Sequence, residues 1–190
     1  MPAMPAMPAK FSLQRPIGDD HLRQVCDTCG FIYYQNPKIV VGVVVGDACG
    51  RVLLCRRAIE PRLGFWTVPA GFMEEGETTS QGALREVWEE ARAKVHIDAL
   101  LGIYEVPRIS QVHFMYRGVL IGDEFGAGPE SLEAAWFDYE TIPWDDLAFP
   151  TGYWALKDWA KVRGQELFLP FSNPLGSEAI THANSKTLNP

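Results

Sequence analysis

The segment between residues 71 and 90 constrains the fold and the chemistry of this chain more than any other. Its periodicity predicts a helix over residues 79–91, opened by a capping box between Thr78 and Gln81. At about 100° per residue, one face of this helix collects three carboxylates. These are Glu86, Glu89 and Glu90. The opposite face is apolar, and we expect it to be buried. It carries Leu84, Val87, Trp88 and Ala91.

The three neighbouring carboxylates require a counter-charge. Like charges three or four positions apart on a helix cost a few tenths of a kcal/mol per pair. Clustered carboxylate oxygens suit a hard divalent cation. The sequence therefore predicts a site for Mg²⁺, or Mn²⁺, on this helix face.

Length and composition limit the class of protein. With 190 residues, of which 47% are hydrophobic, the chain can form one domain and a small appendage. No apolar run approaches the roughly 18 residues of a membrane span. The repeated Met-Pro-Ala of residues 1–9 lacks the pattern of a signal peptide, so we expect a disordered arm and a cytoplasmic protein with reduced thiols. A net charge of −7 argues against a nucleic-acid partner.

Strand patterns surround the predicted helix and indicate an α+β or α/β sandwich. They cover residues 31–34, 39–45, 51–56, 65–68, 95–104, 112–120 and 134–139. A second amphipathic helix is predicted over 152–163. From Phe171 the chain is polar and aperiodic, so we expect a loose tail.

A Cys-x-x-Cys-Gly knuckle at Cys26 and Cys29 could supply half of a tetrahedral zinc site. A closed structural site needs four ligands, and His21 is the only further candidate nearby. A tight turn with free thiols is the simpler interpretation, so we treat Zn²⁺ as doubtful.

The spacing of the segment 71–90 resembles the Nudix box, the signature of Nudix hydrolases, which cleave a nucleoside diphosphate linked to another group. Gly71 is followed by five residues, Glu77, seven residues and then Arg85-Glu86-Val87-Trp88-Glu89-Glu90. The box normally has a glycine where Arg92 stands. A non-glycine residue pays more for a left-handed helix cap, so we expect the helix to continue or to end differently there.

The resemblance extends to a Nudix subfamily with an N-terminal zinc ribbon that includes ADP-ribose and FAD pyrophosphatases. The motifs that carry it are Cys26-x-x-Cys29-Gly30, Tyr34-Gln35-Asn36-Pro37-Lys38, Leu53-Leu54-Cys55-Arg56-Arg57, Trp66-x-x-Pro69-Ala70-Gly71, Ile109-Ser110-Gln111-Val112 and Gly128-Pro129-Glu130-Ser131-Leu132-Glu133. The ribbon's first cysteine pair is missing, so the ribbon resembles a degenerate one.

The family fold is an α/β/α sandwich with a mixed central sheet, here with a small N-terminal hairpin or ribbon remnant. We place a disordered arm at 1–10, the ribbon-like segment at 11–37, the Nudix domain at 38–165 and the tail at 166–190.

The resemblance also implies roles for single residues. Glu86, Glu89 and Glu90 would ligate Mg²⁺ or Mn²⁺ with a backbone carbonyl of Ala70 or Gly71. Glu77 and Arg85 would form a structural ion pair. Glu130 is the first choice for the general base, with Glu133, Glu124 and Glu105 as alternatives. The catalytic set is therefore Glu130, Glu90 and Glu86.

Substrate contacts are expected from Arg57 and Arg108, which can pair with phosphates. Gln111 and His113 alternate on a strand and can both face the site, although a histidine bonded within the fold is the simpler interpretation of His113. Phe65 or Tyr104 could stack on a ring of the substrate.

The activity implied is Mg²⁺-dependent hydrolysis of the pyrophosphate of a nucleoside diphosphate derivative, with ADP-ribose or FAD favoured. NADH and nucleotide sugars stay open as substrates, and so does an idle Nudix-fold sensor. The family resemblance also implies a homodimer, acting on a small molecule and not on a membrane.

Overall fold

The computed structural model describes residues 10–177, and the expected arm of residues 1–9 and the last part of the tail, 178–190, lie outside this range. Contacts within the chain divide it after Asn36 into two compact units.

The first unit is a small antiparallel sheet with the strand order β1-β2-β3. The strands are β1 (Phe11–Gln14), β2 (Arg23–Cys26) and β3 (Ile32–Tyr33). A turn between β1 and β2 is held by Asp19, which accepts hydrogen bonds from the Arg23 guanidinium and the His21 backbone. The predicted hairpin remnant is therefore present as a three-stranded sheet.

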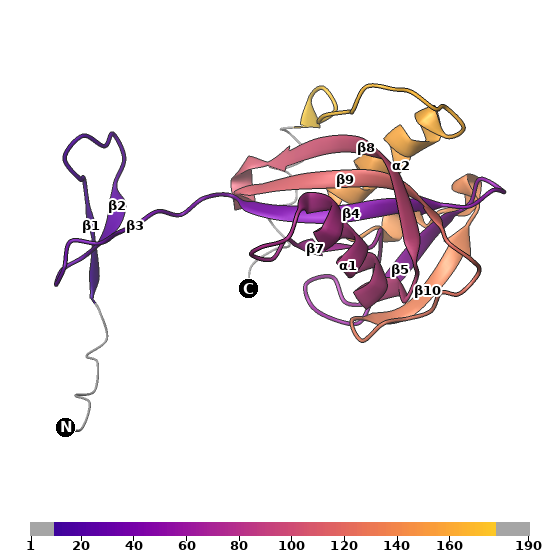
Figure 1. Cartoon of the computed structure of the whole chain (residues 1–190), viewed down its shortest axis with the longest axis horizontal. Coiled ribbons are helices and arrows are strands. Elements are labelled where there is room, and N and C mark those ends of the chain that lie inside the picture. Colours follow the sequence, from indigo (N-terminus) through magenta and orange to yellow (C-terminus); the bar gives the residue numbers. More distant parts are fainter. Residues whose placement is uncertain (1–9, 178–190) are drawn as a thin grey trace. The chain divides into compact units, whose positions relative to one another are not determined.

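The second unit is built on a seven-stranded mixed sheet with the order β10-β5-β4-β9-β8, to which β6 and β7 add at β5 and β4 (Figure 1). The elements are β4 (Lys38–Gly46), β5 (Val52–Arg57), β6 (Trp66–Thr67), β7 (Ala70–Phe72), α1 (Thr79–Ala91), β8 (Val95–Val106), β9 (Gln111–Leu120), β10 (Ser131–Phe137) and α2 (Pro150–Val162). Only β4 and β9 run parallel, and the other pairs are antiparallel.

The sheet is covered by α1 on one face and by α2 on the other (Figure 1). Successive side chains of a strand point to opposite faces, so a strand buried on both faces must be apolar throughout. On β4, Val41, Val43 and Val45 pack in the cluster with α1, and Val44 packs in the cluster with α2. The predicted α/β/α sandwich with a mixed sheet is confirmed.

Helix α1 begins as the sequence predicts. Thr78 is the N-cap, and its side chain and that of Gln81 form the reciprocal capping box. The end of the helix differs from the expectation. Arg92 adopts the left-handed conformation with φ of 50°, and its N–H donates to the Trp88 carbonyl. Its guanidinium lies 5.6 Å from the centre of the Trp88 ring. Arg92 thus ends the helix in the place of the family glycine.

The expectation that the apolar face of α1 is buried is wrong in part, because only Val87 and Ala91 of its four residues are buried. Glu86 and Glu90 are buried, with 8% and 5% of their surface exposed, whereas Leu84 and Trp88 are 36% and 46% exposed. The cause is tertiary packing, because α1 also lies against β7 and against the loop before β10. This second contact covers the glutamates and leaves the far side of the helix open.

The first part of the expected loose tail packs on the outer edge of β8. Phe171 donates its N–H to the Leu101 carbonyl and accepts from the Ile103 N–H. The Asn173 side chain bonds both the N–H and the carbonyl of Glu105. These bonds satisfy backbone groups that an edge strand otherwise leaves unpaired.

No helix in residues 10–177 is long and apolar enough to cross a membrane.

Candidate active site

A cavity of about 710 Å³ opens beside the second half of α1 and collects most of the acidic and basic residues singled out above. Its walls come from the C-terminal part of β5, the loop after it, β7, α1, the start of β9, the residue before β10 and the N-terminus of α2. Glu86, Glu89, Glu90, Arg57 and Glu130 all line it. Such convergence of polar groups in a large cavity is typical of an active site.

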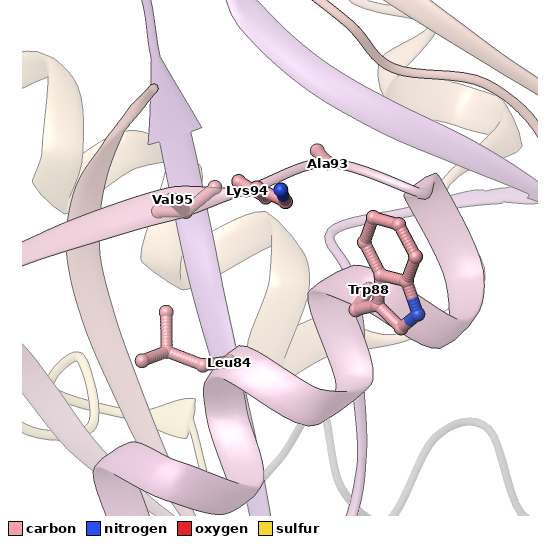
Figure 2. A pocket seen from close by; sticks show the side chains of 5 residues that line it. All are labelled: Leu84, Trp88, Ala93, Lys94 and Val95. Atoms are coloured by element: carbon pink, nitrogen blue, oxygen red, sulfur yellow. The ribbon is translucent and has the colours of Figure 1, made fainter. Parts of the chain in front are cut away.

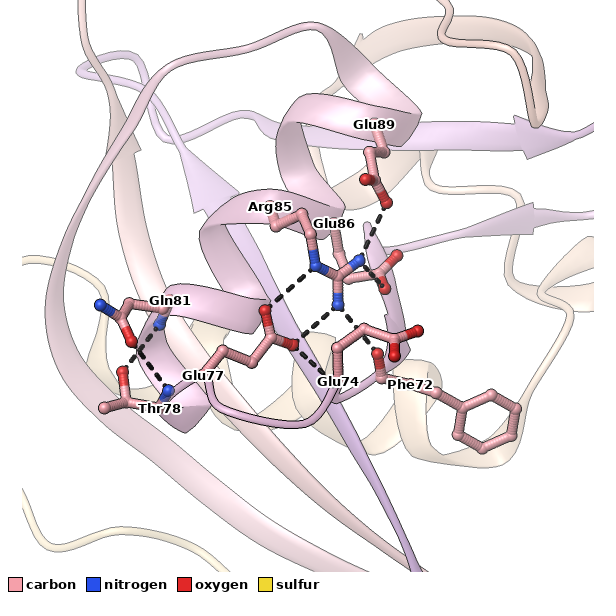
Figure 3. Close-up of polar contacts among 8 residues, drawn as sticks. All are labelled: Phe72, Glu74, Glu77, Thr78, Gln81, Arg85, Glu86 and Glu89. Carbon is pink, nitrogen blue, oxygen red and sulfur yellow. Dashed lines mark hydrogen bonds and ion pairs between the residues drawn. The ribbon is translucent and has the colours of Figure 1, made fainter.

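Arg85 organises the acidic side of this cavity (Figure 3). Its guanidinium donates to both carboxylate oxygens of Glu77 and to the Phe72 carbonyl. It also donates to Glu86 at 2.7 Å and to Glu89 at 2.9 Å. Hydrogen bonds from Arg85 lower the pKa of Glu77, and those to Glu77 raise the pKa of Arg85. The arginine therefore ties the loop before α1 to the helix and partly neutralises two of its acids.

Glu86 fills the space beside Gly71. A β-carbon at position 71 would lie 2.5 Å from Glu86 Oε1, which is closer than atoms can approach. Strand β7 places this glycine by pairing Gly71 with Val41 of β4. A residue without a side chain is thus required wherever the Glu86 carboxylate takes this position.

Glu90 lies deeper and accepts a hydrogen bond from the Ala70 N–H at 3.1 Å. Burial raises the pKa of Glu90 to about 8, and this backbone bond only partly opposes the effect. Burial also raises the pKa of Glu86, against the opposing attraction of Arg85. The charge of Glu86 further raises the pKa of Glu90, and the charge of Glu89 further raises the pKa of Glu86. Two acids in this state gain from a positive charge placed between them.

The donor set fits a hard divalent cation. Carboxylate oxygens and the backbone carbonyls of β7 are oxygen ligands, and Mg²⁺ uses one or two protein carboxylates together with oxygens of a phosphate substrate. Within residues 10–177, no three acidic, histidine or cysteine side chains converge into a complete protein shell. Glu89 is half exposed and bonded to Arg85, so it would have to leave the arginine to reach an ion beside Glu86.

A positive side chain and a helix terminus face these acids across the cavity. Arg57 is 8% exposed, and its Nε donates to the Pro61 carbonyl while its guanidinium lies 5.1 Å from the centre of the Phe149 ring. Its charge opposes the rise in the pKa of Glu90. Phe149 is the N-cap of α2, and Pro150 to Gly152 line the cavity. The free N–H groups and the dipole of such a terminus favour negative charge.

The loop before β10 is fixed to the end of α1. Gly126 and Gly128 donate their N–H groups to the carbonyls of Ala91 and Glu90. A β-carbon at Gly128 would collide with the Glu89 carbonyl. The loop ends at Glu130, whose charge contributes to the raised pKa values of Glu86 and Glu90. The carboxylate of Glu130 thus faces the same cavity as the helix acids.

The alternatives to Glu130 lie elsewhere. Glu105, Glu124 and Glu133 are exposed and do not line the cavity. Tyr104 is fully buried in the core, where its hydroxyl donates to Asp158. Phe65 also lies outside the lining, beside Arg62. The last two rings are therefore not placed to stack on a ligand in this cavity.

The remaining predicted contacts do line the cavity. Arg108 is exposed on the short 3-10 turn Pro107–Ile109, and Gln111 and His113 follow on β9. His113 is buried and its Nε2 lies 3.0 Å from Gln111 Oε1. In the N-terminal unit, Cys26 and Cys29 are free thiols, the first buried and the second exposed.

Two parts of the cavity wall are not predicted from the sequence. They are the loop Ile59–Arg62 and the start of α2. The helix was predicted to begin at Gly152 but begins at Pro150. Proline is favoured at the first helical position, so Phe149-Pro150 was a usable signal for this terminus. Val40 and Met115 also line the cavity. Their place there could not be predicted from the sequence, because it depends on the register of β4 and β9.

A second hollow of about 270 Å³ lies on the outer side of α1 and is lined by Leu84, Trp88, Ala93, Lys94 and Val95 (Figure 2). It contains no acidic side chain. Its apolar wall includes Leu84 and Trp88, two helix residues expected to be buried. It lacks the carboxylates that could hold a divalent cation.

Comparison with known proteins agrees with this geometry. A model of the NUDIX domain matches residues 36–159, and a model of the Nudix N-terminal zinc ribbon matches residues 9–35. The crystal structure of a NUDIX hydrolase from Nitrosomonas europaea is 41% identical and superposes with a TM-score of 0.82 over 90% of this chain and 97% of that one.

Two curated relatives are more distant. An ADP-ribose pyrophosphatase of Methanocaldococcus jannaschii is 33% identical over 61% of this chain and 69% of its own. An NAD-capped RNA hydrolase NudC of Chromobacterium violaceum is 33% identical over 67% of this chain, which spans about half (48%) of that protein. This chain belongs to the Nudix family and is a Nudix pyrophosphohydrolase.

Proposed function

We propose that the protein catalyses Mg²⁺-dependent hydrolysis of the pyrophosphate bond of a nucleoside diphosphate derivative. The products are a nucleoside monophosphate and a second phosphomonoester. The observation that carries this proposal is the pair of buried carboxylates, Glu86 beside Gly71 and Glu90 on the Ala70 N–H, on the wall of a cavity that also contains Arg57.

ADP-ribose or FAD is the favoured substrate. The 33% identity to a protein named ADP-ribose pyrophosphatase supports the first of these. The cavity of about 710 Å³ falls in the range that holds small-molecule ligands. NADH and nucleotide sugars are the competing substrates.

Glu86, Glu89 and Glu90, together with a backbone carbonyl of Gly71 or Ala70, would hold Mg²⁺ or Mn²⁺. When bound, such an ion would supply the positive charge that offsets the pyrophosphate and would make the attacking water more acidic. Arg57 and Arg108 bind phosphate oxygens, with help from the first turn of α2. Glu130 acts as the general base that removes a proton from the attacking water. Glu77 and Arg85 hold the loop and the helix in register and do not contact the substrate.

The test is release of AMP from ADP-ribose in the presence of Mg²⁺. Glu86→Gln and Glu90→Gln should each lower kcat at least 100-fold while circular dichroism shows an intact fold. Glu133→Gln removes an exposed acid outside the cavity and serves as the matched control. Full activity in both cavity variants would overturn the metal assignment. A panel of ADP-ribose, FAD, NADH and nucleotide sugars, with Mg²⁺ and with Mn²⁺, identifies the substrate.

A separate result would support the alternative of an idle sensor. Calorimetry would then show tight binding of a nucleotide that is recovered unchanged after prolonged incubation with metal. The three clustered carboxylates favour the enzyme, because binding alone does not require them.

We also propose that the protein is a cytoplasmic homodimer. The apolar hollow beside Leu84 and Trp88 supports this proposal, because it offers a surface on α1 that a second copy of the chain can cover. Light scattering coupled to size exclusion measures the mass in solution, and a mass of one chain would refute the dimer.

A further inference from the structure

One wall of the cavity is formed by side chains aligned across neighbouring strands. Residues paired directly across two strands point to the same face of the sheet. The registers pair Phe72 with Val40 and Val40 with His113, so these three form one row. The next row toward the sheet end contains Lys38, Gln111 and Val106, because Lys38 pairs with Gln111 and Gln111 with Val106.

Five of these six side chains line the cavity, and their chemistry is unlike that of the acidic wall. Val40, Val106 and Phe72 supply apolar and aromatic surface, and Gln111 and His113 supply the polar groups. Lys38 Nζ lies 5.0 Å from the centre of the Phe72 ring, and Phe72 is half exposed. A flat ring can lie on such a surface with its polar edge toward Gln111.

The carboxamide of Gln111 has a defined orientation. Its Oε1 lies 3.0 Å from His113 Nε2, so with this orientation the nitrogen carries the proton and donates. Burial lowers the pKa of His113 to about 4, so the ring is neutral at pH 7. The Gln111 amide group is left with two N–H donors, and its carbonyl keeps a second lone pair.

We propose that this wall, defined by Val40, Phe72, Val106, Gln111 and His113, is the subsite that reads the adenine base of the substrate. Gln111 is the specificity-determining residue, and His113 is the positioning residue that fixes its amide. The inference rests on the proposed function and narrows it to substrates that contain ADP.

The chemistry of the wall selects a nucleobase over the other parts of such a substrate. A phosphate would require positive charge directed into the cavity, whereas Lys38 lies over the Phe72 ring and does not line the cavity. A sugar would require more hydrogen-bonding groups than one amide and one imidazole. A nucleobase has apolar faces and one polar edge, which match the apolar surface and the single amide. A carboxamide matches adenine in particular, because it donates to a ring nitrogen and accepts from the N6 amino group at once.

The test compares ADP-ribose with IDP-ribose, in which an oxygen replaces the N6 amino group and faces the Gln111 carbonyl. The wild-type protein should prefer ADP-ribose by at least tenfold in kcat/KM. Gln111→Leu should raise KM for ADP-ribose about tenfold, change kcat less than twofold and reduce the preference to near one. His113→Phe should raise KM to a smaller extent, since the amide remains but its orientation is released. Gln24→Leu, on an exposed strand of the N-terminal unit, is the matched control.

Binding of AMP and IMP, measured by calorimetry on the full chain, gives a readout without turnover. Wild type should bind AMP about tenfold more tightly than IMP, and Gln111→Leu should bind both equally. Equal binding of AMP and IMP by wild type, or unchanged AMP binding by Gln111→Leu, would overturn the inference.

The two proposals fail in different ways. If ADP-ribose is hydrolysed and Gln111→Leu behaves as wild type, the proposed function stands and the adenine subsite does not exist. If no derivative is hydrolysed but Gln111→Leu abolishes the preference for AMP, the adenine subsite stands and the proposed function fails.

Discussion

The carboxylate of Glu86 occupies the volume that a β-carbon at Gly71 would need. The glycine of the box is therefore required by the position of a helix side chain that lies fifteen residues later in the chain. Its own backbone does not require glycine, since Gly71 is not among the residues with positive φ. This relationship makes a sharp prediction.

Gly71→Ala should impair catalysis far more than folding. The new methyl group meets the flexible end of Glu86, which can move aside, so the midpoint of thermal unfolding should change by only a few degrees. The displaced carboxylate can no longer ligate, so we expect kcat to fall at least 100-fold. Gly126→Ala is the control, because a β-carbon there meets open space at an ordinary φ. Equal activity of Gly71→Ala and wild type would show that the Glu86 position is not needed.

The buried Glu90 predicts an unusual dependence of stability on pH. Its pKa is about 8 in the fold against 4.5 for the free side chain. A carboxyl group with a raised pKa binds its proton more tightly in the folded protein than in the unfolded chain. Its contribution to the free energy of unfolding is therefore full below pH 4.5 and is lost as the pH rises through 8. The loss from this group amounts to about 5 kcal/mol at most.

Urea unfolding of chelator-treated protein at pH 5 and pH 9 measures this effect. Stability should be lower at pH 9, and Mg²⁺ should restore it there more than at pH 5, because the ion binds the ionised acid. In Glu90→Gln, the loss of stability between pH 5 and pH 9 and its recovery on adding Mg²⁺ should both be much smaller. A stability that rises between pH 5 and pH 9 in the metal-free protein would contradict the prediction.

Arg85 should be a major source of stability for the loop and α1. Arg85→Ala removes its bonds to Glu77, Glu86, Glu89 and the Phe72 carbonyl. It leaves the partly buried acids without a partner, so we expect a loss of about 2 kcal/mol or more in urea unfolding. Arg85→Lys keeps the charge but loses the forked geometry and should recover only part of the loss.

Arg51→Ala is the comparison for Arg85, since Arg51 forms an ion pair with a single carboxylate, that of Asp47, and otherwise lies over the Trp136 ring. The loss of stability in Arg51→Ala should be much smaller than the loss in Arg85→Ala. If both substitutions destabilise the protein equally, the network around Arg85 has no special role.

Arg92→Gly should stabilise the protein. Glycine adopts the left-handed helix end without the cost of about 1 kcal/mol that a side chain imposes. The lost contact of the guanidinium with the half-exposed Trp88 ring offsets roughly half of that gain. Thermal and urea unfolding should show a net gain of about 0.5 kcal/mol, and Arg92→Ala should show none. A clear loss in Arg92→Gly would mean that the contact with Trp88 outweighs the backbone strain.

Local signals carried the prediction of α1. The capping box at Thr78 and Gln81 fixed its start, and its length followed from periodicity, because both depend on residues only a few positions apart. The continuous apolar run of residues 39–45 likewise indicated a strand covered on both faces, and Val41, Val43 and Val45 pack on one face while Val44 packs on the other. The strands could be predicted for this reason, whereas the α/β/α arrangement followed from the resemblance to the Nudix family.

The errors lie where distant segments decide burial. Helical periodicity could not show that the loop before β10 covers Glu90, nor that Leu84 and Trp88 stay partly exposed. The docking of Phe171 on β8 depends on a sheet edge formed some 70 positions earlier in the chain. The wall around Gln111 depends on the register of four strands, β7, β4, β9 and β8, which local sequence patterns cannot determine.

The two hydrogen bonds from Gly126 and Gly128 to the last turn of α1 have a consequence for how this protein responds to damage. They join the segment that ends at Glu130 to the backbone of Glu90. Fraying of the helix end would separate proton removal from ion binding in a single event. Fraying of the last turn of α1 should therefore abolish activity on heating or in denaturant before the whole protein unfolds.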